Sequence, residues 1–199
     1  HIVKDEDLQI VQKLEHDSYW IHYHSLSEDV KSEALKVKAV IDANKEYAIY
    51  KTLVGFEGIF GDWSTSKRDE SFALGSQDSR VKEARVIASR IAYEGFDLWR
   101  RRILAFAKTE SNDMATFPVF YEFLAEVAGS YPDFALDLLL KDSDHLSKFL
   151  IPILRGLWDG ETRDKLVPLL RKRVQEASAE DTDFLYASAK LFLSTKDVD

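Results

Sequence analysis

Apolar side chains recur every three or four residues along most of this chain, which is the spacing of one face of an α-helix. Leu8, Val11 and Leu14 share such a face and predict a first helix from about Asp7 to Trp20. No segment shows the sustained alternation of apolar and polar residues that marks a half-buried strand. The pattern therefore predicts an all-α fold without a sheet.

The next apolar stripe follows a helix-start signal. Glu28 lies three residues after Ser25, which is the spacing of a capping box. The stripe starts at Val30 and either continues to Val54 in one helix or breaks near Asn44. We favour one long helix with a bend.

Residues 55–78 have a different composition, because glycine and serine punctuate them and no apolar period survives there. A connection of this length is uncommon inside a compact domain and is usually functional, disordered or a sign of a missed element. Helical spacing returns at Val81, is interrupted at Gly95 and resumes from Phe96 to about Lys108. We expect either a kinked helix or a tight helical hairpin across Gly95.

From Thr116 onward the sequence is a regular series of helical segments separated by turn signals. Pro132 lies at a plausible first helical position, where its missing N–H is tolerated. The short links favour antiparallel packing of consecutive helices. The predicted helices cover residues 116–129, 132–141, 144–158, 161–176 and 180–194.

Two parts of this region superpose with an offset of 30 residues. Each copy consists of two short amphipathic helices, which can bury their apolar faces only by stacking on a neighbour. A third copy is poor at this offset, because Leu150 and Ile153 fall on Glu180 and Asp183, and we expect a terminal helix with a polar outer face. The matched residues are Phe123, Leu124, Val127, Leu136, Leu139 and Leu140, which fall on Ile153, Leu154, Leu157, Leu166, Leu169 and Leu170.

With these leucine and phenylalanine positions, residues 117–193 resemble HEAT-type repeats, the antiparallel helix pairs that stack into α-solenoids. The resemblance implies a scaffold or sensor role, and some proteins of this kind bind DNA along a concave basic face. We expect a single helical domain over residues 1–199. Its parts are N-terminal helices at 1–54, a Gly/Ser-rich loop at 55–78, a kinked helix or hairpin at 79–110 and HEAT-like helix pairs at 115–195.

Composition narrows the class of protein further. The apolar fraction of 45% and the charged fraction of 31% are those of a soluble globular protein. The chain has no cysteine, which excludes disulfides and thiolate metal ligands. No apolar run approaches the ~18 residues of a membrane span, and no signal-peptide pattern is present. We therefore expect a cytoplasmic protein without a membrane partner.

The net charge of −8 argues against a general nucleic-acid coat, although two helical segments are locally basic. A nucleic-acid or phosphate partner is possible there but not favoured, because consecutive helix residues point in different directions and the cations can pair with nearby carboxylates. The candidate anion-binding residues are Arg100, Arg101, Arg102, Arg163, Lys165, Arg171, Lys172 and Arg173.

Two other groups of residues are candidates for sites. Aromatic and basic residues of the Gly/Ser-rich loop either pin it to the protein or contact a partner, and these are Phe60, Trp63, Arg68 and Phe72. His16, His22 and His24 in segment 16–24 suggest a metal-dependent enzyme as a less favoured alternative. They do not share one helix face and lack the His-Glu-x-x-His spacing, so we expect no metal and no cofactor.

No catalytic motif is recognisable in the sequence. The leading prediction is therefore a non-enzymatic helical-repeat interaction module, part of a larger protein. Its expected partner is another protein or another domain of the same polypeptide.

Overall fold

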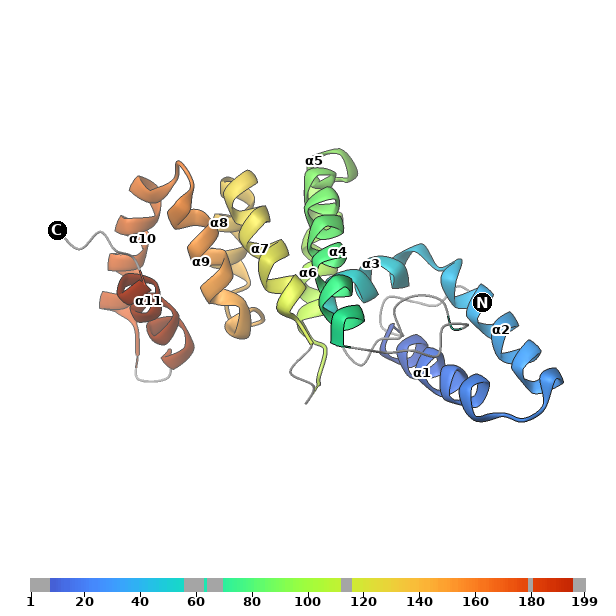
Figure 1. Ribbon diagram of the computed structural model, residues 1–199. Helices are drawn as coiled ribbons and strands as arrows, with labels where there is room; N and C mark the ends of the chain where they lie inside the picture. Colours follow the sequence, from blue (N-terminus) through green and yellow to red (C-terminus); the bar gives the residue numbers. More distant parts are fainter. Residues whose placement is uncertain (1–7, 56–62, 64–69, 112–115, 179–180, 195–199) are drawn as a thin grey trace. The chain divides into compact units, whose positions relative to one another are not determined.

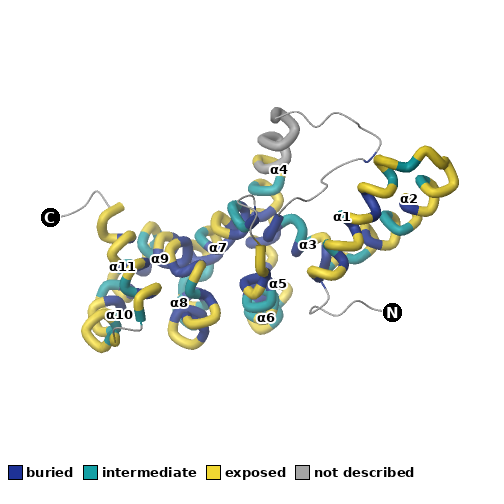
Figure 2. Tube along the Cα trace, turned by 90° about the horizontal axis from the view of Figure 1, so that it is seen from below, coloured by how far each residue is buried: buried dark blue, intermediate teal, exposed yellow. Residues whose placement is uncertain are grey.

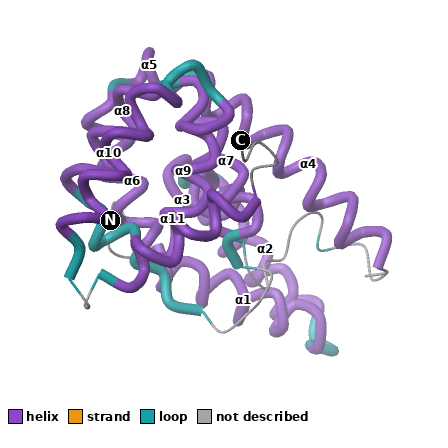
Figure 3. The backbone as a smooth tube through the Cα atoms, turned by 90° about the vertical axis from the view of Figure 1, so that its left-hand side faces the viewer, coloured by secondary structure: helices purple, strands orange, loops and turns teal. Residues whose placement is uncertain are grey.

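The computed structural model describes residues 8–55, 63, 70–111, 116–178 and 181–194, and its regular elements are helices (Figure 1, Figure 3). These residues contain no strand, so the all-α prediction is confirmed for them. The elements are α1 (Leu8–His24), α2 (Glu28–Asp42), α3 (Lys45–Val54), α4 (Glu70–Ser89), α5 (Ile91–Glu94), α6 (Phe96–Ala107), α7 (Pro118–Ser130), α8 (Pro132–Lys141), the 3₁₀-helix η2 (Ser147–Phe149), α9 (Leu150–Asp159), α10 (Arg163–Glu176) and α11 (Thr182–Ser194).

The chain divides into two compact units. Unit 1 comprises residues 1–84 and 109–120, and unit 2 comprises residues 85–108 and 121–199. Within unit 1, the return of the chain after residue 108 is held by a backbone hydrogen bond of 2.6 Å from the Phe117 N–H to the Val54 carbonyl. The single helical domain that the sequence suggests stays a prediction.

In unit 1, α1 and α2 form an antiparallel hairpin and α3 continues from α2 (Figure 1). The prediction of one long helix is wrong, because the chain breaks at Asn44. The Asn44 side chain accepts a hydrogen bond of 3.0 Å from the Tyr47 backbone N–H and so caps α3. The capping box at Ser25 is also wrong, since the N-cap of α2 is Ser27 and its side chain makes no capping hydrogen bond.

The predicted loop at 55–78 is too long at its C-terminal end, because α4 already begins at Glu70. Residues 56–62 and 64–69 lie outside the described part of the chain. Gly55 ends α3 with a φ of 54°, and a side chain there would overlap the guanidinium of Arg80. The Arg80 Nε donates a hydrogen bond of 3.0 Å to the Thr52 carbonyl. Arg80 therefore satisfies the C-terminal end of α3 and holds it against α4.

Around Gly95 the chain forms a helical hairpin, which is one of the two predicted alternatives. Gly95 has a φ of 105°, and the chain reverses at α5 and returns as α6 (Figure 1). The predicted apolar stripe of α6 is confirmed as core, since Trp99, Ile103 and Phe106 are all buried.

The helices of unit 2 lie in two rows (Figure 2). One row contains α6, α8 and α10, and the other contains α7, α9 and α11. Consecutive helices alternate between the two rows, as the short links predict, and the core lies between the rows. HEAT-type membership stays a prediction.

Glycine makes the contact between α7 and α9 close. A Cβ at Gly156 in α9 would lie 2.7 Å from the Ala128 Cβ and 2.9 Å from the Ala125 carbonyl carbon, with the Ala125 oxygen closer still. At Gly129 in α7 the nearest atom to such a Cβ is 3.7 Å away, which is ordinary contact. The two helix backbones therefore meet at Gly156.

Burial corrects the predicted repeat. The offset of 30 holds between α7 and α9, where each matched pair is buried. From α8 to α10 the buried positions recur at 31, because Ala135 corresponds to Leu166 and Leu139 to Leu170. From α9 to α11 they recur at 34, and the third copy is then complete: Leu150, Ile153, Leu154 and Leu157 correspond to Phe184, Ala187, Ser188 and Leu191.

Candidate functional site

An apolar groove of about 520 Å³ lies along the α1–α2 hairpin of unit 1. Ile21 of α1 and Val30, Val37 and Val40 of α2 line it. Ile21 is 51% exposed and Val40 is 74% exposed, so both present most of their surface to solvent. We refer to this site as the hairpin groove.

The groove exists because the apolar stripes of both helices are wider than the contact between them. On α2, Ala34 and Ile41 are buried, whereas Val30 remains exposed. On α1, Leu14 and Ile10 are exposed on the same side as Ile21, at the helical spacing of i, i+4 and i+11. The predicted core face thus includes residues that the hairpin leaves uncovered. Contiguous exposed apolar surface of this kind marks binding sites in soluble proteins.

A buried polar cluster fixes the hairpin to α3. Glu15 of α1 is buried, forms an ion pair with Lys51 and accepts a hydrogen bond of 2.6 Å from the Tyr47 hydroxyl. Burial, together with the neighbouring Glu15 carboxylate, raises the pKa of the Tyr47 phenol, so that the phenol stays protonated and can donate. Because the polar groups of Glu15, Lys51 and Tyr47 bind one another inside unit 1, they hold α1 in position and are not available as reactive groups.

The other side of the hairpin is covered by Trp63. Its ring lies 5.8 Å from the ring of Tyr19 and 5.8 Å from that of His22, and the ammonium of Lys38 lies 5.6 Å from its centre. Trp63 is buried, so it pins the chain to the hairpin, which is one of the two predicted alternatives. Of the other loop candidates, Phe60 and Arg68 lie outside the described residues, and the side chain of Phe72 does as well.

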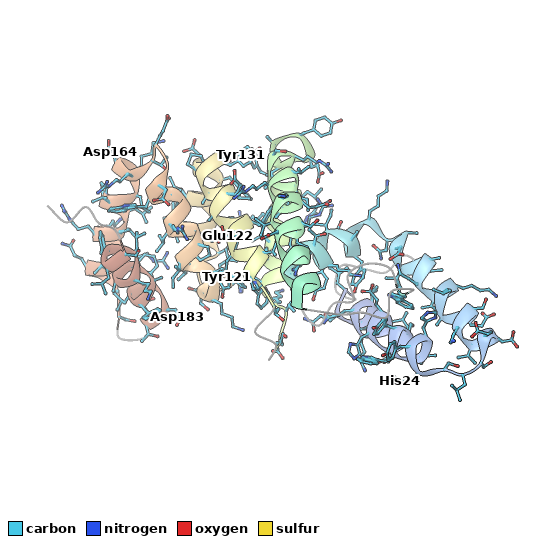
Figure 4. The ribbon with its side chains drawn as sticks, in the orientation of Figure 1. His24, Tyr121, Glu122, Tyr131, Asp164 and Asp183 are labelled. Atoms are coloured by element: carbon cyan, nitrogen blue, oxygen red, sulfur yellow. The ribbon has the colours of Figure 1, made fainter. Side chains whose placement is uncertain are left out.

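The histidines of segment 16–24 do not converge. The Trp20 indole donates a hydrogen bond of 3.0 Å to His16, and His24, at the end of α1 (Figure 4), stacks on the same indole at 5.2 Å. His22 lies instead against Trp63. Among the described residues, no group of three or more histidine, aspartate or glutamate side chains could hold a metal ion.

The first basic segment is bound up in ion pairs within unit 2. Arg100 contacts Asp137 at 3.2 Å and Asp142 at 2.9 Å, and the hydrogen bond to Asp142 raises the pKa of the Arg100 guanidinium. Arg102 pairs with Glu94 at 2.7 Å and covers Trp99.

The second basic segment shows the same behaviour. Arg173 donates to the Leu139 carbonyl at 2.9 Å and to the Ser143 hydroxyl at 2.6 Å. Arg163 lies over Trp158, Lys165 pairs with Asp133 and Lys172 pairs with Glu176, whereas Arg101 and Arg171 are exposed.

The two segments approach each other at one place, the end of α8, where Arg100 reaches Asp142 and Arg173 reaches the adjacent Ser143. Both arginines donate to oxygen atoms there, and these contacts connect α6, α8 and α10. Anion binding at these residues stays a prediction, and it would require those contacts to be exchanged.

Comparison with protein-family models, curated proteins and solved structures finds no match to this chain. In the part of the chain that the structure describes, no helix has the length and apolar character needed to cross a lipid bilayer. The hairpin groove is the candidate site, because it is an exposed apolar surface. In the sequence its residues appear only as an apolar stripe, which is also the pattern of core residues.

Proposed function

We propose that this chain is a helical interaction module that binds an amphipathic helix of another protein, or of another domain of the same polypeptide, in the hairpin groove. The observation that carries the proposal is an exposed row of branched apolar side chains on a hairpin that Glu15 and Trp63 hold in place. Full burial of one valine or isoleucine side chain contributes about 1.5–3 kcal/mol, so covering two or three of them supports specific binding.

The form of the groove favours a helix as its occupant. The apolar row on α2 consists of Val30, Val37 and Val40, and the row on α1 consists of Ile21 in the groove with Ile10 and Leu14 exposed on the same side of the helix. A helix that lies between such rows anchors itself through side chains at i, i+3 or i+4 and i+7.

Charge on the rim specifies the partner further. Glu33 and Lys36 pair with each other at 2.7 Å, whereas Asp29 has no ion-pair partner among the described residues. An amphipathic helix with a basic residue at the edge of its apolar face, placed opposite Asp29, fits this arrangement.

Photo-crosslinking tests the proposal. Benzoylphenylalanine replaces Val40 in the groove or, as a control, Ser32 elsewhere on α2, and the cross-linked partner segment is identified by mass spectrometry. We expect cross-links from position 40 but not from position 32, to a segment with apolar residues at helical spacing. Equal cross-linking from both positions, or a segment without that spacing, would contradict the proposal.

A further inference from the structure

Helix α11 of unit 2 is apolar on two opposite sides. One side consists of Phe184, Ala187, Ser188 and Leu191, which are buried next to α9. The other side is open: Tyr186 is 62% exposed, Leu193 is 86% exposed, and Ala189 between them is exposed as well. Since a helix turns ~100° per residue, Tyr186, Ala189 and Leu193 fall within about 60° of one another, opposite the buried side. We call these three residues the outer face of α11.

The outer face is apolar, whereas the sequence predicts a polar outer face for this helix. A helix side that stays in water is normally polar. α7 and α9, which precede α11 in the same row, also carry apolar residues on more than one side, and those residues are buried. The outer face of α11 thus has the composition of a covered surface, yet Leu193 is almost fully exposed.

Two charged residues flank the outer face on one edge. Asp183 lies at the N-terminal end of α11 (Figure 4), and Lys190 follows seven residues later, about 20° away around the helix. Neither has an ion-pair partner among the described residues. They form a pair of opposite charges whose partners are to be sought outside this chain.

We propose that a second copy of this chain covers the outer face, with the two α11 helices packed antiparallel about a two-fold axis. In that arrangement Tyr186 of each copy packs on Ala189 of the other, and the small alanine admits the ring. Lys190 of each copy then comes within reach of Asp183 of the other, so one contact surface makes two ion pairs. A parallel pair about a two-fold axis along the helices would place the two charged edges on opposite sides of the contact, so neither ion pair could form.

This inference is independent of the hairpin groove, which lies in unit 1. Dimerisation through α11 would present two hairpin grooves per assembly, so a partner with two suitable helices would be bound with avidity.

Sedimentation equilibrium of the full 199-residue chain tests the proposal. We expect a concentration-dependent dimer that Leu193→Asp abolishes and that Val40→Asp in the hairpin groove leaves unchanged. Lys190→Glu and Asp183→Lys should each weaken dimerisation about tenfold, because two ion pairs become two repulsive pairs. The double variant, with both charges exchanged, should restore it.

The charge exchange keeps the test decisive even if one variant folds poorly, because restoration requires a folded dimer of the stated geometry. A chain that stays monomeric up to about 0.5 mM would overturn the proposal. So would a dimer that is insensitive to Leu193→Asp, or single charge variants that the double exchange does not rescue.

Cysteine cross-linking provides a second readout, since the chain has no native cysteine. Under oxidation, Ala189→Cys should form an intermolecular disulfide, because residue 189 lies near the two-fold axis. Thr182→Cys should not, because in an antiparallel pair its two copies are about 16 Å apart along the helix. Cross-linking of Thr182→Cys as efficient as that of Ala189→Cys would show a parallel pair and refute the geometry.

Discussion

Substitution of Gly156 by alanine tests the close contact of α7 and α9, on which the stacking of unit 2 depends. The added methyl group would lie 2.7 Å from the Ala128 Cβ and within contact distance of the Ala125 carbonyl, so backbone has to move. Overpacking of this kind destabilises by about 1–3 kcal/mol, and more when the obstacle is backbone. Alanine gains back about 1 kcal/mol of helix propensity. We therefore expect Gly156→Ala to lower the free energy of unfolding by about 2 kcal/mol.

Gly129→Ala is the matched control, because it makes the same chemical change on the facing helix. The new methyl group would meet nothing closer than 3.7 Å, so the gain in helix propensity should dominate. Urea unfolding monitored by circular dichroism gives the free energies of unfolding. The account predicts that Gly156→Ala is destabilised and that Gly129→Ala is neutral or slightly stabilised. Equal effects at the two positions would refute the stated packing of α7 on α9.

Three further predictions concern the contacts that shape each unit. Gly55→Ala should destabilise unit 1 by more than about 2 kcal/mol, because the alanine would adopt a strained positive φ and its methyl group would overlap the Arg80 guanidinium. A melting temperature within error of wild type would contradict this prediction. The pKa of the Tyr47 phenol is raised in the folded protein, so its contribution to stability is complete below pH ~10 and is lost as the pH rises further, because the phenol ionises first in the unfolded chain. Absorbance at 295 nm should show that Tyr47 ionises only on unfolding. Ionisation of Tyr47 while the fold is intact would disprove this prediction. Arg100→Ala should destabilise unit 2 by about 1–2 kcal/mol, because it removes the ion-pair partner of the buried Asp142 and one of the two partners of Asp137. The exposed Arg101→Ala should change the unfolding free energy by less than about 0.5 kcal/mol, and similar losses at the two positions would count against the ion-pair assignment.

The helices of unit 2 were predictable because apolar spacing and turn residues agree there. α8 (Pro132–Lys141) has the predicted bounds, with proline at its start. The exact repeat was not predictable, because helices and links differ in length between the copies. α8 has 10 residues and α10 has 14, and the links that follow them differ as well, so buried positions do not recur at one constant offset.

The break at Asn44 shows what periodicity misses. The apolar stripe keeps its phase from α2 into α3, so spacing alone reads as one helix. The available signal was the residue type, because an asparagine side chain can accept from the backbone N–H three residues on. The early start of α4 was hidden by Gly75 and the serines around it, whose intrinsic helix preference is low.

The hairpin groove was not predictable from sequence for a different reason. Val30 and Val37 belong to the same stripe as the buried Ala34, and spacing cannot say which of them a neighbouring helix covers. That depends on how α1 packs on α2. The ion pairs of the basic segments were not predictable either, since the partners of Arg100 lie 37 and 42 residues away in sequence.

The central claim is that the hairpin groove binds an amphipathic helix, and calorimetry with the cross-linked partner segment, made as a peptide, tests it most directly. Val40→Asp places a charge on the groove without disturbing the core, since Val40 is largely exposed, and Ser32→Asp adds the same charge elsewhere on α2. The account predicts that Val40→Asp raises the dissociation constant at least about tenfold and that Ser32→Asp leaves it within about twofold of wild type. Equal affinities of wild type and Val40→Asp for the peptide would contradict it.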